Sequence, residues 1–180
     1  MIMVTLGTGV GGGILIGGRI LTGAHGAGGE IGHLCVNYGE TEKCGCGNYG
    51  CLEQYASATG ITRLAKKRLE STEQDSTLRK GPVNAKTVFD AVKAGDRLAD
   101  EIAVEFGRYL GYALANLAAA IDPSVIVIGG GVSKAGKVLI PYVETPYKER
   151  AFFANQDVTF ALAELGNDAG ICGAAKMVLD

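Results

Sequence analysis

The sequence lacks an excess of charge of either sign. Its 17 lysines and arginines nearly balance its 19 aspartates and glutamates, which gives a formal net charge of −2. A protein that binds nucleic acid through its phosphates needs a positive field, and this composition does not provide one. We therefore expect no nucleic-acid partner.

The sequence also lacks the apolar segments that bring a chain to a membrane. No apolar run is long and unbroken enough to span a bilayer, and the N-terminal MIMVTLGTG has no basic stretch followed by the apolar core of a secretion signal. We expect a cytoplasmic protein without a membrane partner. Hydrophobic residues make up 47% of the chain, which is enough for a core and predicts a single domain over residues 1–180.

Glycine, by contrast, is abundant and unevenly placed. The 28 glycines concentrate in four stretches, GTGVGGG, TGAHGAGGEIGH, CGCGNYGC and IGGGVSKAG. Glycines at the ends of apolar segments let the backbone approach itself or a ligand closely. GTGVGGG matches neither the P-loop nor the dinucleotide-binding fingerprint. It is either a plain hairpin or a phosphate contact made by backbone N–H groups and the hydroxyls of Thr5 and Thr8.

Three of the five cysteines form a cluster with a histidine. Cys44, Cys46 and Cys51 lie within eight residues, and His33 precedes them. Three thiolates and one imidazole are a common tetrahedral set for structural zinc, which fits a reducing cytoplasm better than disulfides. Buried thiols and a core histidine are the alternative; ligand type, number and glycine spacing favour zinc. With all four positions filled, this zinc should not activate water.

The other two cysteines, Cys35 and Cys172, stand among apolar residues, and we expect them to be buried.

Two carboxylates flank the cluster, Glu30 before His33 and Glu53 after Cys51. Solvated carboxylates are the ordinary interpretation, and Glu53 could also place negative charge at a helix N-terminus. Aligned carboxylates, however, suit the vicinal hydroxyls of a sugar. In a strand, residues 30 and 33 would face opposite ways, so a shared site requires a bend, which Gly32 permits.

The hydrophobic pattern predicts an α/β domain in which a β-meander precedes alternating helices and strands. We expect Gly17 and Gly18 to form a hairpin turn, and Asp96 to cap a long apolar helix. That helix could belong to the core, which we favour, or to a homodimer interface. The run SVIVI predicts a central strand covered on both faces. The IGGG at its end either allows a nucleoside to pack against the backbone or forms a crowded turn between strand and helix. The predicted strands are 2–6, 13–16, 19–21, 30–36, 124–128 and 158–163, and the predicted helices are 51–70, 85–94, 98–121, 142–151 and 169–179.

These motifs together resemble the ROK family, which comprises repressors, open reading frames and sugar kinases. GEIGH followed by CGCGNYGCLE resembles its zinc and sugar signature. LGTGVGGG and IVIGGGVS resemble its second phosphate loop and its adenosine loop, and LGNDAGICGAA resembles the start of its C-terminal helix. The resemblance covers nearly the whole chain, and is greatest to the members that phosphorylate glucose.

The resemblance implies an actin-like, ribonuclease-H-like ATPase lobe with a zinc-binding loop. It implies ATP-dependent phosphorylation of glucose or a related hexose at the 6-hydroxyl, with Mg²⁺ accompanying ATP, and we expect a homodimer or a higher homo-oligomer. It implies that His33 joins zinc to the sugar. The implied sites are zinc on His33, Cys44, Cys46 and Cys51, sugar on Glu30, His33 and Glu53, phosphates at Thr8 and Gly9, and adenosine at Gly129, Gly130 and Gly131.

The sequence departs from the family in one respect. Its kinases carry an N-terminal lobe with a D-x-G-G-T-type loop and a catalytic aspartate, and neither is found here. We therefore expect a C-terminal lobe that holds no catalytic residue and is inactive alone. The alternatives are the effector-binding lobe of a ROK-type sugar-responsive repressor, whose helix-turn-helix would lie upstream, and a non-catalytic, zinc-stabilised interaction domain. Intact glycine loops favour the kinase.

Overall fold

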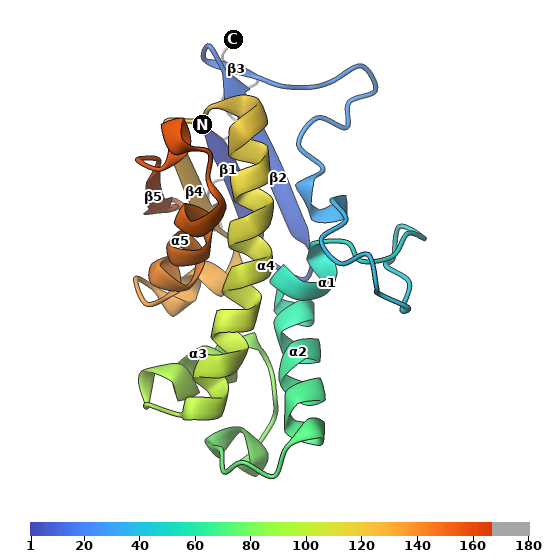
Figure 1. The fold of residues 1–180 in the computed structure, drawn as a ribbon, viewed down its shortest axis with the longest axis vertical. Helices are drawn as coiled ribbons and strands as arrows, with labels where there is room; N and C mark the ends of the chain where they lie inside the picture. The colour runs from blue at the N-terminus through green and yellow to red at the C-terminus, as the bar shows by residue number, and fades with distance from the viewer. Residues whose placement is uncertain (167–180) are drawn as a thin grey trace.

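The fold is a five-stranded sheet with helices packed against it (Figure 1). The computed structural model describes residues 1–166, so the predicted helix 169–179, Cys172 and most of the motif LGNDAGICGAA lie outside the described residues. The strands are β1 (Ile2–Leu6), β2 (Val10–Ile16), β3 (Arg19–Ile20), β4 (Val125–Gly129) and β5 (Thr159–Leu162). The helices are α1 (Glu53–Ala56), α2 (Ala58–Ser71), α3 (Ala85–Lys93), α4 (Arg97–Ile121) and α5 (Leu139–Arg150), and 3-10 turns occupy η1 (Ile31–His33), η2 (Thr77–Lys80), η3 (Gly131–Ala135) and η4 (Phe153–Asn155).

The sheet confirms the predicted meander. Its strand order is β3-β2-β1-β4-β5, in which the first three strands are antiparallel and β4 runs parallel to both β1 and β5. Gly17 and Gly18 have φ angles of 56° and 77°, as a primed hairpin turn requires. β2 begins at Val10, three residues earlier than predicted, because glycines 11–13 pair with β1 through their backbones and need no side chain for this.

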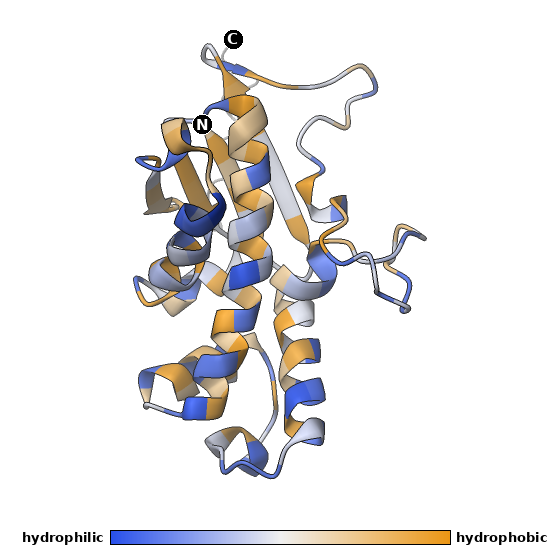
Figure 2. Ribbon diagram, viewed as in Figure 1, coloured by the Kyte–Doolittle hydropathy of each residue, from blue (hydrophilic) through white to orange (hydrophobic). Residues whose placement is uncertain are grey.

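The core lies between the sheet and α4. Asp96 accepts a hydrogen bond from the Ala99 amide at 3.1 Å and so caps this 25-residue helix, as predicted. Figure 2 shows hydrophobic β1 and β4 behind a helix whose hydrophobic and hydrophilic residues alternate. The apolar stripe of α4 is therefore part of the core, as favoured. The fully buried residues of α4 in this stripe are Leu98, Ile102, Phe106, Leu110 and Leu114, and those of the sheet are Ile2, Val4, Leu6, Ile126 and Ile128.

The described residues cover one face of β4 better than the other. Ile126 and Ile128 are fully buried, whereas Val125 and Val127 are only half-buried by residues 1–166. The strand predicted from SVIVI is confirmed; its burial on both faces is not seen within the part of the chain that the structure describes. No helix among the described residues is long and apolar enough to cross a membrane.

The predicted strand 30–36 is wrong. The chain turns there in the 3-10 helix η1, because Gly32 packs directly on β2: a Cβ at this position would lie 2.2 Å from the Val10 carbonyl oxygen. Ile31 is buried by the same contact, with 3% of its surface exposed. The segment therefore crosses the end of β2 and does not extend the sheet.

The predicted helix 51–70 is two helices. Ser57 is extended, with φ −79° and ψ 169°, and its hydroxyl accepts a hydrogen bond from the Gly60 amide at 2.9 Å. A serine in this conformation caps α2 and ends α1. Gly60 allows α2 to approach α1, since a Cβ there would lie 2.8 Å from the Tyr55 backbone.

Gly107 sets the distance between α4 and α5. A Cβ at this position would lie 1.9 Å from the Tyr142 carbonyl oxygen. We expect Gly107→Ala to lower the free energy of unfolding by about 1–3 kcal/mol, because overpacking outweighs the better helix propensity of alanine. Urea denaturation measures this effect. Asn116→Ala, on the exposed side of α4, is the control and should not destabilise the protein; equal stability of both variants would contradict the prediction.

Candidate functional site

The first glycine loop lies against two helices. The Gly7 carbonyl oxygen accepts a hydrogen bond from the Ala58 amide of α2 at 2.8 Å. The Val10 amide donates to Glu53 Oε2 at 3.3 Å, and a Cβ on Gly9 would lie 2.2 Å from the same oxygen. The loop between β1 and β2 and the carboxylate of Glu53 are thus in direct contact, although 43 residues separate Val10 from Glu53.

The cysteine segment folds into a tight turn that brings its thiols together. The Cys44 amide donates to the Asn48 carbonyl oxygen at 2.7 Å, and the Gly47 amide donates to the Cys44 carbonyl oxygen at 2.9 Å. Gly50 has φ 68°, and a Cβ there would lie 1.9 Å from the Asn37 carbonyl oxygen, so only glycine fits. The glycines that punctuate the thiols therefore shape this turn.

The four predicted metal ligands come together. One donor atom from each of His33, Cys44, Cys46 and Cys51 lies within 4.8 Å of all the others. The Sγ atoms of Cys46 and Cys51 are 3.6 Å apart, and His33 Nδ1 is 3.9 Å from Cys44 Sγ. Tetrahedral zinc places such donors about 3.5–3.8 Å from one another. The donor set and its spacing fit a zinc ion.

Burial opposes ionisation of two of these thiols. It raises the pKa of Cys44, and together with hydrogen bonds that the Cys51 thiol donates to its neighbouring cysteines it raises the pKa of Cys51 to about 12. The Asn48 amide lowers the pKa of the exposed Cys46. Zinc binds thiolates, so metal binding here would release protons. Cys35, expected to be buried, is exposed and lies outside the cluster, because segment 30–36 does not join the sheet.

The bend of η1 brings the predicted sugar ligands into one cavity. Residues three apart are eclipsed in a 3-10 turn, so Glu30 and His33 lie on one side. Together with Glu53 they line a cavity of about 380 Å³. The same cavity is lined by Thr5, Gly7, Gly9, Val10, Gly11 and Gly130. Cys44 Sγ donates to Glu53 Oε1 at 3.3 Å, which connects this carboxylate to the cysteine cluster.

The remaining predicted residues lie around this cavity. Thr8 lines an adjacent hollow together with Gly9 and Glu53. Gly131 lines a separate pocket. Gly129 is buried at the end of β4, where a Cβ would lie 2.8 Å from Met3 Cε. The structure therefore unites the carboxylates, His33, Gly9 and Gly130, and gives Gly129 a packing position.

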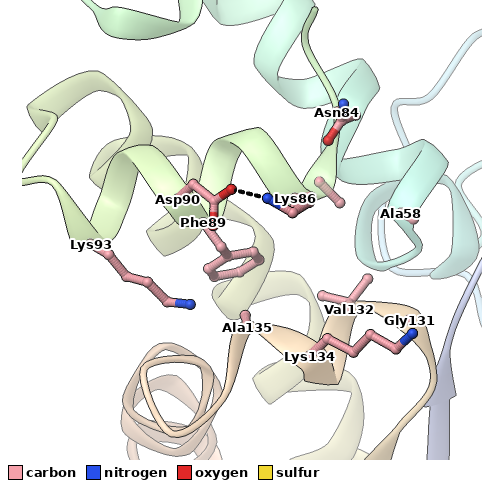
Figure 3. A pocket seen from close by; sticks show the side chains of 11 residues that line it. Ala58, Asn84, Lys86, Phe89, Asp90, Lys93, Gly131, Val132, Lys134 and Ala135 are labelled. Atoms are coloured by element: carbon pink, nitrogen blue, oxygen red, sulfur yellow. Dashed lines mark hydrogen bonds and ion pairs between the residues drawn. The ribbon is translucent and has the colours of Figure 1, made fainter.

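A second pocket, of about 340 Å³, lies between α3, η3 and the start of α2 (Figure 3). Phe89 and Val132, both nearly buried, form an apolar floor beside Gly131. Lys93 and Lys134 stand at the rim, and Lys86 pairs with Asp90. Sequence reasoning missed the contribution of α3, because a phenylalanine at helical spacing carries no signal that separates a pocket floor from a core position.

An ionic network, also missed, ties the cysteine segment to α2. Glu40 accepts hydrogen bonds from the Tyr55 hydroxyl and the Arg63 guanidinium. Burial opposes ionisation of Glu40, yet hydrogen bonds from Tyr55, the Glu42 amide and Arg63 lower its pKa to about 2. Gln54 adds a further link, since it accepts from the Cys51 amide and donates to the Glu42 carbonyl oxygen. Gln54, which follows Glu53 in the sequence, thus connects Glu42 and Cys51, which lie on either side of the cysteine turn.

Comparisons with known proteins show which proteins this chain resembles. The ROK family pattern matches residues 1–180. A glucokinase from Halalkalibacterium halodurans is 45% identical over 99% of this chain and 56% of its own length. The crystal structure of a ROK family glucokinase from Streptomyces griseus in complex with glucose and AMPPNP is 35% identical, with a TM-score of 0.88 over 98% of this chain and 59% of its own.

A transcriptional regulator is also among the similar structures. A ROK family transcriptional regulator, homologous to the Escherichia coli MLC protein, is 32% identical, with a TM-score of 0.85 over 97% of this chain and 44% of its own. The chain spans little more than half the length of the glucokinases it matches. The matched family pattern, the identities and the shared α/β architecture of an actin-like ATPase lobe lead to one conclusion: the chain belongs to the ROK family.

Proposed function

We propose that residues 1–180 form the C-terminal lobe of an ATP-dependent sugar kinase that phosphorylates glucose at its 6-hydroxyl. The observation that carries this proposal is the single cavity in which Glu30, His33 and Glu53 meet both glycine loops. Acceptors for hydroxyls and backbone donors for phosphates are what a sugar and a nucleotide need side by side. The similarity to two glucokinases, one in complex with glucose and AMPPNP, supports the same assignment.

In this proposal the carboxylates of Glu30 and Glu53 accept hydrogen bonds from sugar hydroxyls. His33 is shared: Nδ1 faces the thiols, which leaves Nε2 for the sugar. Such a ligand connects the position of the metal to the position of the substrate. Zinc, held by His33 and the three cysteines, stabilises the turn, and Glu53 is held in place by the Val10 amide.

The nucleotide occupies the other side of the glycine loops. The flat pocket over Phe89 and Val132 suits adenosine, and Gly130 and Gly131 let its ribose approach the backbone. The phosphates, accompanied by Mg²⁺, then extend toward Thr8 and Gly9, beside the N-terminus of α2. Gly129 contributes by close packing under this loop.

Phosphoryl transfer breaks the bond between the terminal phosphorus and the ADP oxygen and forms a bond between that phosphorus and the sugar oxygen. The hydroxyl proton must pass to a base. The family resemblance assigns this role to an aspartate of an N-terminal lobe, and neither it nor the D-x-G-G-T-type loop is found in these 180 residues. Because transfer requires nucleophile, phosphates and Mg²⁺ to be positioned together, we infer that the chain alone is inactive.

Two other functions make different predictions. A sugar-responsive repressor lobe is favoured by the similarity to a ROK transcriptional regulator, whereas the intact loops GTGVGGG and IGGG favour the kinase. The upstream sequence of the parent gene separates these two: a phosphate loop and an aspartate indicate an enzyme, and a helix-turn-helix indicates a repressor. A zinc-stabilised interaction domain should bind neither glucose nor ATP. The homodimer and the cytoplasmic location stay predictions.

Calorimetric titration of the purified chain tests the proposal. We expect AMPPNP with Mg²⁺ and glucose each to bind with a 1:1 stoichiometry, and we expect no glucose 6-phosphate to form with ATP. Binding of neither ligand would contradict the proposed function and favour an interaction domain. Zinc-dependent phosphorylation of glucose by these 180 residues would contradict the inactivity of the isolated lobe.

A further inference from the structure

Thr5 lies in a row of three paired residues that runs across β2, β1 and β4, and it is the only one of the three that is not glycine. It pairs with Gly11 on β2 and with Gly129 on β4. Paired residues normally place their Cβ atoms about 4.5–5.5 Å apart on the same face, and here both neighbours have none. The Thr5 side chain is exposed.

The space beside Thr5 depends on these glycines. A Cβ on Gly11 would lie 2.6 Å from Thr5 Oγ1, so the hydroxyl occupies the volume that a side chain at position 11 would take. A Cβ on Gly129 would meet Met3 Cε at 2.8 Å. The sheet therefore forms a hollow around a single hydroxyl, one residue before β1 ends.

This hollow belongs to the cavity of the proposed active site. Thr5 lines it together with Glu30, Glu53 and the glycines of both loops. Gly130 packs against the residue that follows Thr5, since a Cβ there would lie 2.6 Å from the Leu6 carbonyl oxygen. The two carboxylates repel a phosphate, so an anionic group in this cavity must lie at the glycine side, where Thr5 adds a neutral donor to the backbone amides.

We propose that the Thr5 hydroxyl donates a hydrogen bond to an oxygen of the terminal phosphoryl group of the nucleotide, at the point where this group faces the sugar. The inference rests on the proposed function and adds to it the residue that recognises the third phosphate. Thr5 positions this group and exchanges no proton with it, so the bonds made and broken remain those of the transfer itself.

ADP and AMPPNP differ in the terminal phosphoryl group, which only AMPPNP carries. A comparison of their affinities for the chain, both in the presence of Mg²⁺, therefore tests this role. In calorimetric titrations of the 180-residue chain we expect AMPPNP to bind more tightly than ADP. Thr5→Val removes the hydroxyl and keeps the β-branched shape; it should weaken AMPPNP binding about tenfold or more, as expected for a lost hydrogen bond to a charged group. The affinity for ADP should change less than twofold. Thr5→Ser keeps the hydroxyl and should keep the preference for AMPPNP.

Zinc content and thermal unfolding, measured on each variant, show that the fold is retained. A Thr5→Val chain that still prefers AMPPNP, or that loses affinity for both nucleotides equally, would overturn the inference. An unsubstituted chain that binds both nucleotides with the same affinity would also overturn it, while leaving the nucleotide site in place. An unsubstituted chain that binds neither would contradict the proposed function itself, and with it the role of Thr5.

Discussion

Cys51→Ser should remove zinc from the chain, whereas Cys35→Ser should leave it bound. Cys51 is fully buried, and its sulfur lies 3.6 Å from that of Cys46, inside the cluster of four donors. The backbone of Cys35 pairs with that of Cys51 in an isolated antiparallel β-bridge. The Cys35 side chain is nevertheless exposed and lies outside the cluster. The two substitutions make the same chemical change, and only the one at Cys51 removes a member of the cluster. We expect one zinc per unsubstituted chain by elemental analysis, and almost none in the Cys51 variant.

The loss should be large but local. A structural zinc site contributes on the order of 10 kcal/mol of metal-binding free energy, much of which stabilises the segment around it. Segment 33–52 contributes few residues to the apolar core, whereas α4 is buried against the sheet. In hydrogen-exchange measurements, zinc extraction should therefore remove protection from residues 33–52 and leave α4 protected. A chain that is free of metal and fully protected in this segment would contradict the zinc assignment.

Glu53→Gln should abolish most of the affinity for glucose. The carboxylate of Glu53 accepts from the Val10 amide, faces Cys44 and lines the cavity. Glutamine has the same size but one acceptor oxygen, so it cannot satisfy the Val10 amide and accept from a sugar hydroxyl equally well. Hydrogen bonds to charged groups contribute about 1.5–3 kcal/mol, which corresponds to a loss of affinity of about 10- to 100-fold.

Glu70→Gln is the control for this substitution. Glu70 is an exposed carboxylate on α2, so its replacement changes the net charge equally and should leave the affinity for glucose unchanged. Zinc content and the affinity for ADP should also stay constant in the Glu53 variant, which separates loss of a sugar contact from loss of the fold. Unchanged glucose binding by Glu53→Gln would show that this carboxylate is not a sugar ligand.

The sequence was most informative where short-range patterns determine the structure. The spacing of Cys44, Cys46 and Cys51 in glycine-rich sequence, after His33, predicts a cluster of four metal ligands, and the four donor atoms lie within 4.8 Å of one another. The apolar periodicity of 98–121 and the capping residue Asp96 likewise predict α4 almost to its ends. These features depend on residues close in the chain, so local chemistry is sufficient to predict them.

Features that depend on contacts between residues far apart in the chain could not be predicted from the sequence. The turn at η1 follows from the contact of Gly32 with β2, and without that contact 30–36 has the pattern of a strand. Glu40 and Arg63 are 23 residues apart, and each alone has the pattern of an ordinary surface charge. Phe89 becomes a pocket floor only because η3 packs opposite it. In each case the partner is supplied by the tertiary structure.

The central claim is that the cysteine cluster holds one wall of a sugar site, and one titration tests it directly. Glucose is titrated into the chain when it is loaded with zinc, after the zinc has been extracted, and after it has been restored. Because His33 belongs to the cluster and Glu53 contacts Cys44, we predict that glucose binding is lost with the metal and returns with it. Glucose binding of equal affinity in the zinc-free chain would contradict the account.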